Sequence, residues 1–197
     1  MKELMRKLTI KNRPVIITGF IYSASWLIIV LSAWITDLHR YDLSKTVSAY
    51  IGFRKWTVVL YFISATIMFT LLVIYVHKKS MHLFKKLVYY IVFISVWGCA
   101  IFPCNTQWSE TITSIHLCFA YGLMFSATFS FLLTILFATN RGQRIFAAAT
   151  LLYAILFIIS LLILKWSWFT GTIFIWENLC IYLLLVELLL ETPHASF

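Results

Sequence analysis

Six long apolar stretches separated by short polar connections dominate this chain. They run over residues 14–35, 56–76, 87–102, 112–137, 145–164 and 171–190. A helix of roughly 20 residues crosses a hydrocarbon core about 30 Å thick, and most of these stretches are close to that length. They are apolar all round, whereas a membrane β-strand has about ten residues of alternating polarity. The pattern therefore predicts an all-α, polytopic membrane protein, with a six-transmembrane-helix bundle as a single domain over residues 1–197.

The first apolar stretch follows a basic segment and in this respect resembles a secretory signal peptide. Residues 1–13 contain five Lys and Arg side chains, and the stretch that follows has 22 residues. The hydrophobic part of a cleaved signal has only about 7 to 15 residues. We therefore expect the first stretch to be retained as a membrane span.

The composition excludes a water-soluble domain, because 62% of the residues are hydrophobic and only 12% are charged. A net charge of +9 would point to nucleic acid in a soluble protein. Here the basic residues form short clusters between the spans, which is how membrane orientation is encoded. We expect membrane lipids as partners and no nucleic acid, while the oligomeric state is left open.

The distribution of basic residues also predicts an orientation. Eleven of the sixteen Lys and Arg residues fall on the side of the N-terminus, and five fall on the opposite side. Because cytoplasmic loops carry the excess of positive charge, both termini are predicted to be cytoplasmic, in a multi-pass protein of the cell membrane.

Three ionisable residues lie inside the apolar stretches, where a charge costs about 2.5 to 3.5 kcal/mol at the bilayer centre. They are His116, Glu177 and Glu187. His116 and Glu177 each lie about one helical turn inside the predicted extracytoplasmic end of a span, so we expect them to share one pocket. Glu187 lies near the opposite end, and we interpret its carboxylate as reaching toward water.

Further polar residues at the extracytoplasmic end predict a pocket that binds a lipid or another amphiphile. The candidate ligand-binding residues there are Asp37, His39, Asn105 and Trp176. In the structural interpretation, His116 bonds a neighbouring helix and Glu177 bonds a neighbouring residue or an outer-loop Arg.

Two other functions stay open. In a lipid hydrolase or acyltransferase, Glu177 would orient His116 as general base, and a loop hydroxyl such as Ser48 would be the nucleophile. These three residues form the candidate catalytic group. A small transporter is the second alternative, but it needs polar residues in the cytoplasmic halves of the spans, which are mainly Leu, Ile, Phe and Val.

The sequence does not indicate a metal or a cofactor. The four cysteines have no CxxC spacing, and no HExxH or HxxxH pattern occurs in a span. His116 is the only histidine within a span, whereas a membrane haem needs paired axial ligands.

Several short motifs stand in an order that resembles a known family. They are Ser48 to Gly52 followed by Trp56, Phe102 and Pro103, His116, Gly171, and Glu177. The order is similar to that of the domain-of-unknown-function 998 family of six-span membrane proteins, which is distantly similar to the Frag and DRAM families. The resemblance covers residues 44–190 and implies a six-helix bundle, but this family has no settled activity to carry over.

This resemblance supports Ser48, Pro103, His116 and Glu177 as positions of interest. Family members often have an acidic residue after the Phe-Pro pair, where this chain has Cys104 and Asn105. A second likeness is to the androgen-induced six-span lipid hydrolases, which pair a threonine near the second span with a histidine in the fourth. Thr46 or Thr57 and His116 occupy roughly those places here.

Overall fold

The computed structural model of the chain describes residues 2–36, 45–102, 110–138, 140–160 and 173–191, and these ranges contain helices but no strand. The helices are α1 (Lys2–Thr36), α2 (Val47–Ile51), α3 (Lys55–Lys78), α4 (Leu83–Ile101), α5 (Glu110–Phe137), α6 (Arg141–Ile159) and α8 (Ile173–Leu190). Five of them are long and apolar enough to cross a membrane, namely α1 over Asn12–Thr36, α3, α4, α5 and α6. With α8 as the sixth long helix, the predicted all-α membrane bundle is confirmed.

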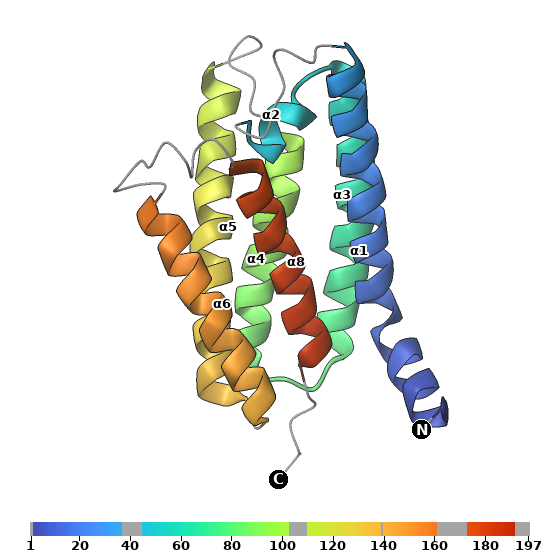
Figure 1. Cartoon of the computed structure of the whole chain (residues 1–197), viewed down its shortest axis with the longest axis vertical. Coiled ribbons are helices and arrows are strands. Elements are labelled where there is room, and N and C mark those ends of the chain that lie inside the picture. The colour runs from blue at the N-terminus through green and yellow to red at the C-terminus, as the bar shows by residue number, and fades with distance from the viewer. Residues whose placement is uncertain (1, 37–44, 103–109, 139, 161–172, 192–197) are drawn as a thin grey trace.

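The six long helices form a ring in chain order (Figure 1). Helix α1 packs against α3, α3 against α4, α4 against α5, and α5 against α6. Helix α8 closes the ring between α6 and α1, and its backbone approaches these two neighbours less closely than the other pairs approach each other. The bundle is therefore tightest at α4 and α5 and loosest around α8.

The two ends of the bundle differ. The short helix α2 lies at one end, which we call the α2 end (Figure 1). Helix α1 begins and α8 ends at the opposite end, which we call the terminal end. An even number of long helices places the start of the first and the finish of the last at the same end, as the six predicted spans require.

Most helix boundaries lie within five residues of the predicted spans, but α1 begins at Lys2, twelve residues before its predicted span. Local capping explains two of the smaller differences. Helix α4 begins four residues before its predicted span, after His82, whose Nδ1 accepts a hydrogen bond from the Phe84 N–H (3.3 Å). Helix α6 begins after Asn140, whose side-chain oxygen accepts from the Gly142 N–H (2.8 Å). These side chains satisfy N–H groups that have no partner within the helix, so the helices extend beyond the apolar stretches.

The distribution of polarity is that of a protein surrounded by lipid. Large apolar side chains are exposed on the outer faces of the helices, for example Phe20, Ile63 and Leu152. Several hydroxyl groups are buried inside the bundle, and many bond their own helix, as Thr150 does to the Phe146 carbonyl oxygen (2.8 Å). Lipid offers no hydrogen-bond partner, so polar groups are satisfied inside the bundle.

Small residues allow the close approach of α4 and α5. A Cβ atom added at Gly98 of α4 would overlap the Phe119 ring of α5, and one added at Gly122 of α5 would lie 3.1 Å from the Ser95 Oγ of α4. The Phe119 ring is itself stacked on Phe102, with 5.8 Å between ring centroids. Glycine at position 98 is therefore a packing requirement of this interface.

We expect the substitution Gly98→Ala to destabilise the bundle by about 1 to 3 kcal/mol, because the added methyl group must displace the Phe119 ring. The measurement is the thermal unfolding of the purified protein in a mild detergent. Gly19→Ala is the matched control, since its Cβ would meet only the Leu185 Cδ1 at 3.6 Å, an ordinary contact. Equal melting temperatures for the two variants would contradict the assignment.

Candidate functional site

His116 of α5 caps the end of the neighbouring helix α4. Its Nδ1 atom lies 2.6 Å from the Phe102 carbonyl oxygen, and the Cys99 backbone is also within hydrogen-bonding range. The last carbonyl groups of a helix have no partner within it, and a carbonyl oxygen only accepts, so Nδ1 carries a proton and donates it. The His116 side chain is buried. This bond to a neighbouring helix agrees with the structural interpretation of the sequence.

Glu177 of α8 binds the start of α2. Its Oε2 accepts a hydrogen bond from the Val47 N–H (2.6 Å), and Val47 is the first residue of α2. That N–H group has no partner within the short helix, so the carboxylate satisfies it. No ion pair with Glu177 occurs over the described ranges. The side chain therefore fastens α2 to α8.

The contacts of His116 and Glu177 are separate. No hydrogen bond joins the two side chains in the described part of the chain, and each binds a different backbone group. The other sequence candidates Asp37, His39 and Asn105 lie outside the described residues, as do the side chains of Ser48 and Trp176. The shared pocket and the candidate catalytic group therefore stay predictions.

Thr57 is a hydroxyl that the likeness to lipid hydrolases would use, and it is fully buried. Its Oγ1 lies 2.7 Å from the Ile51 carbonyl oxygen and 2.5 Å from that of Arg54, and it accepts from the Arg54 N–H at 3.0 Å. These bonds organise the first turn of α3. The buried hydroxyl therefore has a structural role at this helix start.

Polar side chains also join α8 to α1. The Tyr22 hydroxyl donates to the Asn178 Oδ1 (2.8 Å). One turn further along α8, the Tyr182 hydroxyl bonds the Ser23 Oγ (2.6 Å) and accepts from the Trp26 Nε1–H (3.1 Å). This set of hydrogen bonds holds the loosely packed α8 against α1 on the half of the bundle nearer the α2 end.

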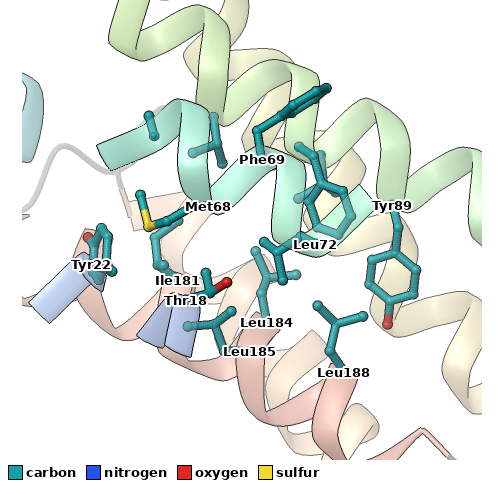
Figure 2. Close-up of a pocket in the computed structure, with 14 residues that line it drawn as sticks. Thr18, Tyr22, Met68, Phe69, Leu72, Tyr89, Ile181, Leu184, Leu185 and Leu188 are labelled. Atoms are coloured by element: carbon teal, nitrogen blue, oxygen red, sulfur yellow. The ribbon is translucent and has the colours of Figure 1, made fainter. Parts of the chain in front are cut away.

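A cavity of about 50 Å³ lies below these contacts, between α1, α3, α4 and α8 (Figure 2). Its walls are almost entirely apolar, and they are formed by Thr18, Tyr22, Ala65, Met68, Phe69, Leu72, Tyr89, Val92, Phe93, Val96, Ile181, Leu184, Leu185 and Leu188. Tyr22 and Tyr89 lie at opposite sides of the group in Figure 2, with the leucines of α8 between them. The cavity occupies the place where α8 stands away from α3 and α4.

A buried polar cluster, which we call the Lys85 cluster, lies at the terminal end. It consists of Lys85 of α4, Ser130 and Thr134 of α5, Gln143 of α6, Glu187 of α8, and Glu191, which directly follows α8. The Lys85 Nζ contacts the Glu191 carboxylate and lies 3.9 Å from the Glu187 Oε1. Gln143 donates to the Glu191 Oε2 (2.9 Å). The cluster therefore ties α4 and α6 to the end of α8.

Two hydroxyl groups of α5 also donate hydrogen bonds to the Glu187 carboxylate. Ser130 donates to the Glu187 Oε2 (3.0 Å), and Thr134 donates to the Oε1. The Glu187 side chain is 0% exposed. The sequence interpretation, in which this carboxylate reaches toward water, is therefore wrong, because α4 and α5 provide partners for it inside the bundle.

The sequence contains a signal for this cluster that the sequence interpretation missed. Ser130 and Thr134 are four residues apart and therefore lie on one face of α5. Lys85 lies just before the third predicted span and Glu187 near the end of the sixth, and two antiparallel spans place these positions at the same depth. A lysine near a span end is also a determinant of orientation, so its position alone does not indicate a buried partner.

Over the described residues, no three His, Cys, Asp or Glu side chains are grouped so that they could hold a metal ion. Each of the clusters above is instead made of hydrogen bonds and ion pairs within the chain.

Comparisons with protein-family models, with curated proteins and with solved structures gave no match for this chain. The resemblance to the six-span family therefore stays a prediction.

We expect His116→Leu to destabilise the protein by about 1 to 3 kcal/mol, because the carbonyl groups at the end of α4 would be buried without a donor. His116→Gln retains an N–H donor and should lose less. Thermal unfolding in detergent measures both effects, with Ser114→Ala as a control, since Ser114 is exposed on the same helix and bonds only the Glu110 carbonyl oxygen of that helix. A melting temperature of His116→Leu equal to that of the control would rule out the capping role.

Proposed function

We propose that this integral membrane protein binds a membrane amphiphile, with its apolar part in the cavity and its polar part near Asn178 and Glu177. The observation that supports this is the double role of Tyr22. Its ring lines the apolar cavity, and its hydroxyl donates to Asn178 at the cavity's edge. An amphiphile requires such a junction of apolar walls and hydrogen-bonding groups.

The face of α8 has the spacing that this function needs. Ile181, Leu184, Leu185 and Leu188 line the cavity and recur at helical intervals. Asn178 lies one turn before Ile181 on the same helix face, so polar and apolar contacts follow each other along one line. The proposed site therefore runs from the α2 end inward along α8.

The size of the cavity limits what it holds in this state. A cavity of about 10 to 15 Å³ holds one water molecule, so a cavity of about 50 Å³ admits only a short apolar group. A longer acyl chain requires α8 to move away from α3 and α4. The loose packing of α8 makes this the place where such a movement costs least, because fewer close contacts must be broken.

We expect Ala65→Val to reduce amphiphile binding several-fold, because the two added carbon atoms occupy the cavity beside α8. The probe is a phosphatidylethanolamine with a photoactivatable diazirine in one acyl chain, cross-linked in vesicles, and its attachment sites are mapped by mass spectrometry. Cross-links are expected on α8 between Ile181 and Leu188.

Ala148→Val is the matched control, since Ala148 is exposed on the outer face of α6. The melting temperature of Ala65→Val should stay the same or rise, which separates blocked binding from misfolding. Equal cross-linking of α8 in the two variants, or cross-links restricted to the outer faces, would refute the proposal.

We also propose that the terminal end faces the cytoplasm, as the excess of Lys and Arg at that end supports. Arg54 lies at the α2 end of α3, Lys78 lies at its terminal end, and both are exposed. A membrane-impermeant maleimide should label Arg54→Cys in intact cells and Lys78→Cys only after permeabilisation. Mass spectrometry of the labelled peptides distinguishes the new cysteines from the four native ones, Cys99, Cys104, Cys118 and Cys180. The opposite labelling pattern would reverse the orientation.

A further inference from the structure

The short helix α2 packs onto the same four helices that surround the cavity. Its backbone approaches α1, α3, α4 and α8, and these four helices also form the cavity walls (Figure 1). Two side chains of α2, Tyr50 and Ile51, are 1% and 3% exposed. They belong to one hydrophobic cluster with Tyr22, Ala65 and Met68, which line the cavity. The buried face of α2 therefore continues the apolar interior from the cavity to the α2 end.

The position of α2 depends on its neighbours, because the helix is too short to be stable alone. It has five residues, Val47–Ile51. Isolated helices shorter than about 12 residues are marginal in water even when their sequence favours helix. Contacts with the surrounding helices must therefore hold α2 in place.

The C-terminal end of α2 is fixed to α3 and α1. Only residues 52–54 separate α2 from α3. The Thr57 hydroxyl of α3 donates to the Ile51 carbonyl oxygen (2.7 Å), and the Trp34 Nε1–H of α1 donates to the Tyr50 hydroxyl (2.8 Å). Helices α1 and α3 also pack closely against each other. This end of α2 is thus attached to a closely packed part of the bundle.

The N-terminal end of α2 is attached to α8 instead. The Val47 N–H donates to the Glu177 Oε2 (2.6 Å). Helix α8 approaches its neighbours less closely than the other long helices do. The two ends of α2 are therefore held by parts of the bundle that differ in how easily they move.

We propose that α2 is a hinged plug that closes the cavity toward the α2 end, and that the hydrogen bond between Glu177 and Val47 keeps it closed. The hinge is the C-terminal end, where Ile51 is bound to Thr57. A hydrogen bond is lost when the distance of 2.6 Å increases by about 1 Å, so a displacement of α8 of that size releases Val47. The movement of α8 that a long acyl chain requires thus also opens the plug. This role rests on the proposed function, because the plug controls entry to the cavity that binds the amphiphile.

The first test is hydrogen–deuterium exchange of the full chain in phosphatidylcholine nanodiscs, followed by mass spectrometry. Glu177→Leu removes the acceptor, so the α2 amides should exchange about tenfold faster, while those of α4 keep their rates. Glu110→Leu is the matched control, since Glu110 is the exposed first residue of α5 at the same end of the bundle. Equal exchange of α2 in the two variants would overturn the proposal.

Glu177→Gln keeps the decision possible if the leucine variant does not fold. The Gln side chain has nearly the same size and still offers a carbonyl oxygen, but the hydrogen bond loses its charge and becomes weaker. The α2 amides of this variant should exchange several-fold faster than those of the wild-type protein. Exchange at the wild-type rate would contradict the role of the carboxylate.

The second test measures access to the cavity with a small charged methanethiosulfonate reagent. Ala65→Cys places a thiol in the cavity wall, and Ala127→Cys places one at an equally buried position of α5 outside the cavity. Combined with Glu177→Leu or Glu177→Gln, the cysteine at position 65 should react several-fold faster than in the wild-type background, and the cysteine at position 127 should not. Unchanged reaction at position 65, or an equal increase at both positions, would refute the plug.

These measurements fail separately from those of amphiphile binding. Cross-links of the lipid probe on α8 together with α2 exchange that ignores Glu177 would leave the binding site and remove the plug. Faster α2 exchange in Glu177→Leu without any cross-link on α8 would remove the binding site and, with it, the role of α2 in controlling entry of an amphiphile.

Discussion

The fastening of α8 at its two ends is the interaction on which the arrangement of this bundle depends. Near the α2 end, Tyr22 bonds Asn178, and Glu177 bonds the backbone of Val47. At the terminal end, Glu187 and Glu191 contact Lys85. Between these ends the helix faces an apolar cavity. Helix α8 is therefore held by polar contacts at its ends and by weaker packing in its middle.

In lipid, such polar contacts contribute much of the free energy that holds the helices together. In a membrane, apolar side chains gain little by turning inward, because the surrounding acyl chains are equally apolar. Close packing of small residues and satisfied polar groups must hold the helices together instead. Gly98 allows the first of these between α4 and α5, and the Lys85 cluster provides the second between α4, α5, α6 and α8. Helices α4 and α5 are thus held together mainly by close packing, whereas α8 is held mainly by polar contacts.

The polar residues of the chain accordingly serve more than one purpose. His116 and Thr57 satisfy helix ends, which any bundle of this kind requires. Tyr22 combines a structural hydrogen bond with a place in the wall of the cavity. Glu187 and Gln143 belong to a buried polar cluster, in which the Gln143 Oε1 has no hydrogen-bond donor among the described residues. The proposed function accordingly rests on the cavity beside Tyr22, where a hydrogen bond borders an apolar space.

The sequence by itself determined the class of fold and the approximate position of each long helix, because a helix that crosses lipid must be long and apolar throughout. It also identified His116, Glu177 and Glu187 as residues needing an explanation, since charges in apolar stretches are costly. Only the tertiary structure decided their partners. Hydrogen bonds act over about 3 Å, so whether Glu187 reaches water or Lys85, and whether Glu177 meets a histidine or the start of α2, depends on helix rotation and depth. Hydrophobic patterning leaves these undetermined when nearly every face of a helix is apolar.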